Sequence, residues 1–431
     1  MYRILIGIWG IGCLTVPLLF SSEWSSFRGE SGMGIHTGKM ALSWQKKDIV
    51  WSKEIEGEGQ SSIIQAGSKI FVTSAIENKL RLLHCFDKEK GDLLWKREII
   101  NSRDESIHRM NGWATATPAI EGDRVVAFFG PAGLHCFDLE GNKKWDIDLG
   151  EFPSHWGVAA SPIIHNGLVI QNCDAIGKSR LVAIDIQKGE IVWDTPRTDK
   201  PKGGWSTPIV ITAQGKKQVV LNGEFGVKGY SIQDGKELWF CESFNGRGSP
   251  VPFYDGELLF VINGKPGDLY AVDPTGKGNI TKTHMKWHAR RNGGRDLPSP
   301  AAVQGLIFAT SMSGIITCYD SKSGERGIYN GMSAKKTVEQ LNERYKDEDG
   351  RFHEADMWKY WMLQEGVIGV DKDFLKMNNG GQPPVMHVDS TAPLYSDTTK
   401  KLITDELWGI YYKPDIEGLG VQGGTSPYIV D

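Results

Sequence analysis

The side chains best suited to binding a ligand lie in short polar segments, each of which precedes an apolar stretch of the chain. They are aromatic, imidazole, amide and charged side chains: His108, Asn111, Trp113, His155, Trp156, Trp205, Arg295 and Asp296. Indole and imidazole rings can cover planar or apolar groups, and the other side chains can hydrogen-bond polar ones. If folding brings these segments together, they predict a site for a planar or polar ligand. The alternative is that the rings only fill space between strands.

The sequence contains none of the familiar catalytic or metal-binding motifs. There is no Walker-type loop, no H-E-x-x-H, no paired C-x-x-C and no G-x-S-x-G. We therefore predict no catalytic residues and no metal ligands. Asp174 and Asp296 have the chemistry of a ligand or a base, but no spacing selects them.

The candidate residues must be positioned by a hairpin that recurs along the chain. It first appears as Cys85-Phe86-Asp87, followed by a turn glycine, Gly91, and by Trp95. The later copies are Cys136-Phe137-Asp138 to Trp145, Ala183-Ile184-Asp185 to Trp193, Gly229-Tyr230-Ser231 to Trp239, Ala271-Val272-Asp273 to Trp287, and Cys318-Tyr319-Asp320 to Gly324. The first position accepts Cys, Ala and Gly, which predicts a small buried side chain. The Asp is expected to form the turn, and the Trp to pack between neighbouring sheets.

Each hairpin belongs to a unit of roughly 42 to 50 residues, a length typical of propeller blades. Five units begin with Ser or Thr before Pro: Thr117-Pro118, Ser161-Pro162, Thr207-Pro208, Ser249-Pro250 and Ser299-Pro300. We predict an all-β fold, a β-propeller of four-stranded blades with about six repeats. An incomplete propeller is the alternative, because the sixth copy has Ile328 at the position where the other copies have Trp. Residues Val50 to Ile55 are expected to form a lone strand ahead of the first unit.

The pattern of small residue, Asp, turn Gly and Trp resembles the PQQ-like (quinoprotein-type) β-propeller repeat. Trp24-x-x-Phe27-Arg28-Gly29 also looks like the start of secreted bacterial members of that superfamily. The resemblance covers about residues 24–325. It implies a propeller whose function is open, since the superfamily includes PQQ-dependent dehydrogenases and a lipoprotein that binds partners without a cofactor.

We therefore expect a non-catalytic binding or scaffold module with no cofactor, which binds a protein, glycan or small molecule at its loop face. The alternative is a PQQ-dependent quinoprotein oxidoreductase acting on alcohols or sugars, with PQQ and calcium. The dehydrogenases typically hold the quinone beside an adjacent-cysteine disulfide, and this chain has no Cys-Cys pair. The single cysteines are expected to be packing residues.

The ends of the chain differ from the repeats. Residues 1–22, with Arg3 ahead of an apolar run from Ile4 to Phe20, predict a signal peptide and an extracytoplasmic, periplasmic or secreted protein. An uncleaved membrane anchor is the alternative. The net charge of −4 gives no reason to expect a nucleic-acid partner.

The C-terminal tail, residues 326–431, is predicted to be a mixed α and irregular segment, fused or partly disordered. Helices are expected at 335–345 and 357–363. The segment from Leu407 to Gly424 is faintly similar to flavin-dependent amine oxidoreductases, which suggests a fused fragment. An unfamiliar native extension is the alternative.

Overall fold

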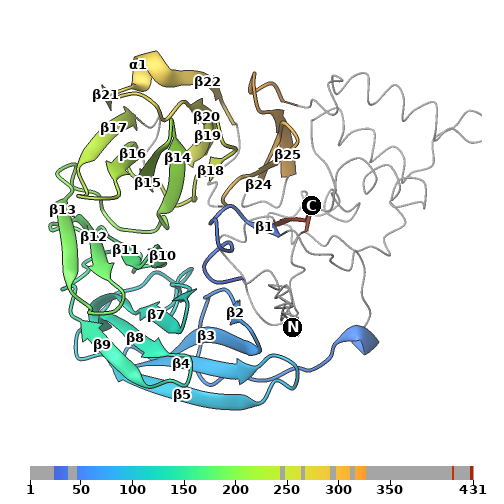
Figure 1. Cartoon of the computed structure of the whole chain (residues 1–431), viewed down its shortest axis with the longest axis vertical. Coiled ribbons are helices and arrows are strands. Elements are labelled where there is room, and N and C mark those ends of the chain that lie inside the picture. Colours follow the sequence, from blue (N-terminus) through green and yellow to red (C-terminus); the bar gives the residue numbers. More distant parts are fainter. Residues whose placement is uncertain are drawn as a thin grey trace, which may run out of the picture.

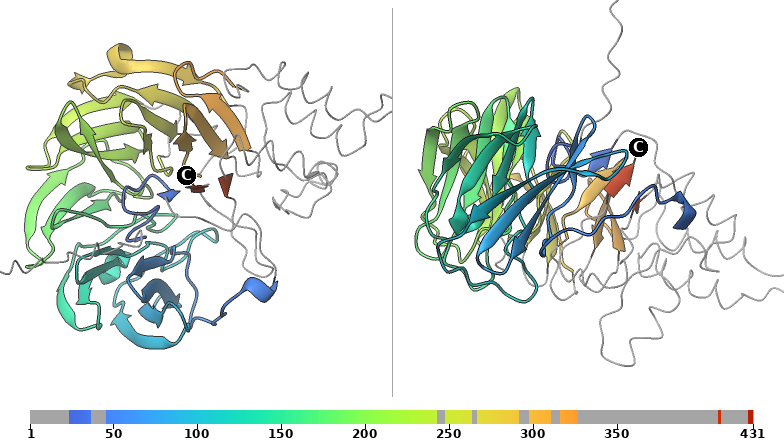
Figure 2. Two further views of the ribbon diagram at one scale, coloured as in Figure 1. Left: turned by 45° about the vertical axis from the view of Figure 1, so that its right-hand side comes forward. Right: turned by 90° about the horizontal axis from the view of Figure 1, so that it is seen from below.

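The computed structural model describes residues 24–36, 46–242, 248–263, 267–291, 298–310 and 316–326, together with two short strands at 410–411 and 428–430. Within these ranges the fold is almost entirely β. Successive small sheets follow one another around an arc in the order of the sequence (Figure 1; Figure 2). The predicted β-propeller of four-stranded blades is confirmed.

Each blade is an antiparallel meander of short strands. Blade 1 contains β2 (Ile64–Ala66), β3 (Lys69–Ile76), β4 (Leu80–Asp87) and β5 (Leu93–Ile100). Blade 2 contains β6 (Ala119–Glu121), β7 (Arg124–Phe128), β8 (Leu134–Asp138) and β9 (Lys143–Ile147). Blade 3 contains β10 (Ile163–His165), β11 (Leu168–Cys173), β12 (Arg180–Asp185) and β13 (Ile191–Pro196).

The later blades depart from this plan at their outer edges. Blade 4 contains β14 (Ile209–Ala213), β15 (Lys216–Gly223), β16 (Gly226–Ser231) and β17 (Glu237–Glu242). Blade 5 contains β18 (Phe253–Tyr254), β19 (Leu259–Asn263), β20 (Asp268–Val272) and β22 (Met285–Ala289). Its insertion forms helix α1 (Thr281–His284) and β21 (Gly278–Asn279), which pairs in parallel with β17 of blade 4. Three strands of blade 6 are described, β23 (Ala301–Val303), β24 (Leu306–Thr310) and β25 (Ile316–Asp320).

The remaining described elements lie outside the blades, except for one 3-10 turn between β7 and β8 of blade 2. Strand β1 (Ile35–His36) pairs in parallel with β27 (Tyr428–Val430), which pairs with β26 (Ile410–Tyr411). Two 3-10 turns occur at Lys46–Asp48 and Gly130–Ala132. The predicted signal peptide and nearly all of the predicted tail, with both its expected helices, lie outside the described residues. Among the described residues, no helix has the length and apolar character needed to cross a membrane.

The small residue at the start of each hairpin lies directly opposite the Trp. Cys85 pairs with Trp95, Ala183 with Trp193, and a bulge follows at the same place in each of blades 1 to 5. A Cβ on Gly229 would overlap the indole of Trp239. The prediction of a small buried side chain is therefore confirmed, and its cause is the Trp across the ladder.

The same Trp joins blades 1, 2, 3 and 5 to the blade that follows, whereas Trp239 of blade 4 donates to Gln218 Oε1 of its own blade (2.6 Å). Trp95 Nε1 donates to Leu139 O (2.9 Å) and Trp145 Nε1 donates to Ile186 O (2.7 Å), in each case the residue after the turn-forming Asp of the following blade. A Cβ on the turn glycine Gly189 would lie 2.6 Å from the Trp145 ring. Glycine is therefore required at this turn for two reasons: its φ is +72°, and the Trp145 ring leaves no space for a Cβ.

The Ser or Thr that opens each unit provides a second link. The Thr117 hydroxyl accepts a hydrogen bond from Ser62 N (2.9 Å), and the Ser161 hydroxyl accepts one from Thr117 N (2.9 Å). The Thr207 hydroxyl likewise accepts from Ser161 N (3.0 Å).

One prediction was wrong: Val50–Ile55 forms no ladder with the described strands. Trp51 nevertheless donates to Lys88 O (2.8 Å), as the Trp of an outer strand does.

Candidate functional site

The candidate residues lie in the loops that run from the outer strand of one blade to the inner strand of the next. We call these the leading loops; they span residues 101–118, 148–162 and 197–208. Because consecutive strands are antiparallel, the leading loops share one edge of the sheets with the turns between second and third strands. Arg295 and Asp296 lie outside the described residues.

Two leading loops meet through an aromatic pair. The ring centroids of His108 and Trp156 are 4.0 Å apart, with 32° between the planes. Asn111 Nδ2 donates to Trp156 O (2.7 Å) and to Val158 O (3.3 Å), and Thr115 Oγ1 donates to Asn111 Oδ1 (2.6 Å). The Asn111 amide therefore holds the second loop against the first and fixes the Trp156 backbone beneath His108.

A hydrogen bond within its own loop also holds the His108 ring. Met110 N donates to His108 Nδ1 (3.2 Å), so in the neutral ring Nε2 carries the proton. The ring is half-buried, and Arg109 and His155 beside the pair are exposed. The pair thus forms a partly exposed aromatic surface, and its neighbours in the sequence, Arg109 and His155, carry nitrogen donors.

A third loop joins the second through Trp205. Its Nε1 donates to Gly157 O (3.1 Å), and a Cβ on Gly203 would lie 2.5 Å from its ring. Trp113 turns the other way and donates to Glu105 O (3.1 Å). The structure therefore brings His108, Asn111, Trp156 and Trp205 together, while Trp113 packs within its own loop.

A buried ion pair, which the sequence analysis missed, anchors the first loop. Arg81 Nη2 lies 2.8 Å from Glu105 Oε2, and the two side chains are 0% and 5% exposed. Burial raises the pKa of Glu105, against the opposing effect of Arg81 and of a hydrogen bond from the Val158 backbone. Glu105 thereby connects blade 1 to the leading loops on either side of blade 2. The sequence contains little evidence for this ion pair, because Arg81 and Glu105 lie in different units and neither is part of the repeated motif.

Asp174 lies in a second buried group of charges, between blades 3 and 4. Arg197 Nε donates to Asp174 Oδ1 (2.7 Å), and the Arg197 guanidinium also donates to the Tyr230 hydroxyl. Burial raises the pKa of Asp174 to about 6, although Arg197 opposes the shift. Its carboxylate is engaged by Arg197, so the structure gives it a packing role.

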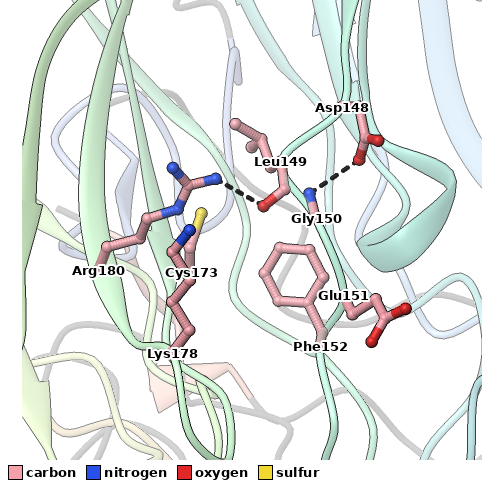
Figure 3. Close-up of a pocket in the computed structure, with 8 residues that line it drawn as sticks. All are labelled: Asp148, Leu149, Gly150, Glu151, Phe152, Cys173, Lys178 and Arg180. Atoms are coloured by element: carbon pink, nitrogen blue, oxygen red, sulfur yellow. Dashed lines mark hydrogen bonds between the residues drawn. The ribbon is translucent and has the colours of Figure 1, made fainter.

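A cavity of about 260 Å³ lies beside the second leading loop. Figure 3 shows Arg180, Lys178 and Cys173 on one side of it, and Asp148, Glu151 and Phe152 on the other. Arg180 Nη2 donates to Leu149 O (2.6 Å) and Gly150 N donates to Asp148 Oδ1 (2.8 Å), which fixes the two walls. Both signs of charge line the cavity, a few residues from His155 and Trp156.

The described side chains that could contribute to a site for PQQ and calcium are engaged with other side chains. The described residues contain no group of three or more His, Cys, Asp or Glu side chains placed to hold a metal ion. Asp174 is paired with Arg197, and the Trp156 ring packs against His108 in a tilted arrangement. We therefore assign neither a quinone site nor a calcium site to these residues.

The repeated blades define the class: this is a PQQ-like β-propeller repeat protein. The family model described as outer membrane protein assembly factor BamB matches residues 37–155 and 81–327, and the chain belongs to that family.

Relatives carry several different names. A polyvinylalcohol dehydrogenase from Pseudomonas sp. is 20% identical, over 68% of this chain and 54% of its own length. The chain thus spans about half the length of that curated relative. Among solved structures, BamB from Moraxella catarrhalis is 14% identical, with a TM-score of 0.46 over 64% of this chain and 75% of its own. A europium-containing methanol dehydrogenase is 10% identical, with a TM-score of 0.42 over 71% of this chain and 84% of its own.

Proposed function

We propose that this chain is an exported, non-catalytic binding or scaffold module whose leading loops hold a protein, glycan or small molecule. The observation that carries the proposal is the fixed pair of His108 and Trp156, locked by Asn111 across two loops. A rigid aromatic surface with nearby donors can bind a partner at little cost in conformational entropy. Export is supported by the apolar run from Ile4 to Phe20 and by the outer-membrane role in the family description.

A site-specific photocrosslinker tests this directly. Placed at the exposed His155, it should give a defined adduct in cells that express the full chain. The Trp156→Ala variant should abolish that adduct, because it removes the aromatic surface. The matched control carries the crosslinker at Lys90, an exposed residue in a hairpin turn on the opposite edge of blade 1. Equal labelling at both positions, or labelling that survives Trp156→Ala, contradicts binding at the leading loops.

The second candidate function is a quinoprotein oxidoreductase acting on alcohols. It is favoured by the similarity to a polyvinylalcohol dehydrogenase, although the chain covers 54% of that protein. The test is to add PQQ and calcium to the purified protein and to follow dye reduction with ethanol, glucose and polyvinyl alcohol. Turnover that depends on PQQ would replace the binding proposal; its absence, with the crosslinked adduct present, supports it.

A further inference from the structure

Residues 24–36, which precede the blades, lie in the middle of the arc rather than on its outside (Figure 1). Their backbone is tied to the inner strands of the first two blades. Gln65 N, in blade 1, donates to Trp24 O (2.9 Å), and Ile120 N, in blade 2, donates to Ser25 O (2.8 Å). The start of the segment therefore extends the hydrogen bonding of two blades at once.

The far end of the segment packs against blades 4 and 5. Met33 is 7% exposed and belongs to the apolar core that those blades share. Tyr254 N, in blade 5, donates to Met33 Sδ (3.3 Å). A Cβ on Gly32 would lie 3.1 Å from the Ile209 side chain of blade 4. The segment thus crosses from the first blades to the later ones.

Arg28 connects the same segment to blade 6. Its Nη2 donates to Pro300 O (2.8 Å), just ahead of β23, and to Met33 O (2.7 Å), while Nε donates to Gly32 O (3.1 Å). The residue is 1% exposed. Hydrogen bonds from a buried guanidinium to carbonyl oxygens are charge-assisted and costly to lose. Arg28 has a φ of +65°, so the surrounding contacts also hold its backbone in a conformation that non-glycine residues seldom adopt.

We propose that residues 24–36 form a clasp that couples blades 1 and 2 to blade 6, with Arg28 as its anchor. The Trp and Ser/Thr links each join one blade to the next along the chain. The clasp instead joins residues 272 positions apart in the bond from Arg28 to Pro300. Where only neighbouring blades are linked, small displacements at each junction add up along the array. A direct link between the first and last described blades restricts their relative motion.

Native-state hydrogen exchange of the full chain tests the clasp. Arg28→Met removes the bond to blade 6 without touching blades 1 or 2. The amide protons of Gln65 and Ile120, which the clasp carbonyls accept, should then exchange at least tenfold faster. The matched control is Arg180→Met, which removes a guanidinium from blade 3 and should leave both rates unchanged. If Arg28→Met does not accumulate, the same two amides are measured in Arg28→Lys, by the same criterion.

The clasp is contradicted if Gln65 and Ile120 keep their wild-type exchange rates while amides next to Pro300, such as those of Ala301 and Ala302, exchange faster. Arg28 would then stabilise only its own surroundings. Equal acceleration of Gln65 and Ile120 in Arg180→Met would also overturn it, because the effect would be general destabilisation.

Discussion

The indole of Trp51 covers Gly91, the turn glycine of blade 1, as closely as Trp145 covers Gly189 of blade 3. A Cβ on Gly91 would lie 2.5 Å from the Trp51 ring. Trp51 precedes every described blade, yet it makes the contact that an outer-strand Trp makes with the following blade. On the side away from blade 2, blade 1 therefore has the same Trp-to-glycine contact that links successive blades.

Gly91→Ala should destabilise the fold more than an alanine at a glycine with the same backbone but open space. Gly67 is the matched site, because its φ is +55° and nothing lies within 4 Å of a Cβ there. Gly67→Ala should cost about 1 kcal/mol for the backbone alone. Gly91→Ala should cost about 3 kcal/mol, because it also pushes against Trp51. Urea unfolding of both variants measures the difference, and equal losses would show that the Trp51 ring moves aside freely.

The described cysteines should resist alkylation in the native protein. All five are buried and outside disulfides, and burial raises the pKa of Cys85, Cys136 and Cys241 to about 12. At pH 8 almost no thiolate is present, so iodoacetamide should modify these positions only after unfolding in guanidinium. Mass spectrometry of the two samples gives the comparison. Fast labelling of the native protein would contradict their role as packing residues.

Breaking the ion pair of Arg81 and Glu105 from one side should cost more than removing it whole. Arg81→Met leaves a buried carboxylate without its guanidinium, a loss of about 3–5 kcal/mol. The double variant Arg81→Met, Glu105→Leu should recover much of that loss, because no unpaired charge remains. Urea unfolding of the single and double variants gives the free energies of unfolding. Strictly additive losses would mean that the two charges are not coupled.

Asp174 should make stability depend on pH between about 4 and 6. Its pKa is raised to about 6 in the folded protein and is about 3.9 in an unfolded chain. In this window the folded state binds a proton that the unfolded state lacks, so the free energy of unfolding should decrease as pH rises. The effect should be at most about 3 kcal/mol. Urea unfolding of wild type and Asp174→Asn across this range measures it, and parallel pH profiles would contradict it.

The sequence predicted what repeats within one unit. The Cys85 position, the turn at Gly91 and the Trp at Trp95 follow from local geometry and from copies that can be compared.

The sequence predicted that the Trp packs between neighbouring sheets, but it could not predict which atoms of the next unit the Trp contacts. The acceptor of the Trp95 hydrogen bond is a backbone carbonyl 44 residues away. Every residue has a backbone carbonyl, so the residue types do not show which one is the acceptor. Arg28 was noticed as part of an opening motif, but its partner Pro300 lies in the last described blade. The ligand-site prediction was limited in the same way: grouping His108 with Trp156 depended on loop conformation, and Arg295 and Asp296 stay a prediction.

The hydroxyl relay from Ser62 through Thr117 and Ser161 to Thr207 has a consequence for how such a chain changes over generations. At the three junctions from Ser62 to Thr207, each unit supplies a hydroxyl acceptor to the unit before it and a backbone N–H donor to the unit after it. The junction at Ser299 differs, because its hydroxyl accepts from Val251 N (2.8 Å). If one of these units were duplicated or deleted as a whole, the two units brought next to each other would still form the same hydrogen bond. Loss of part of a unit would not, so viable length variants should differ by whole multiples of the repeat.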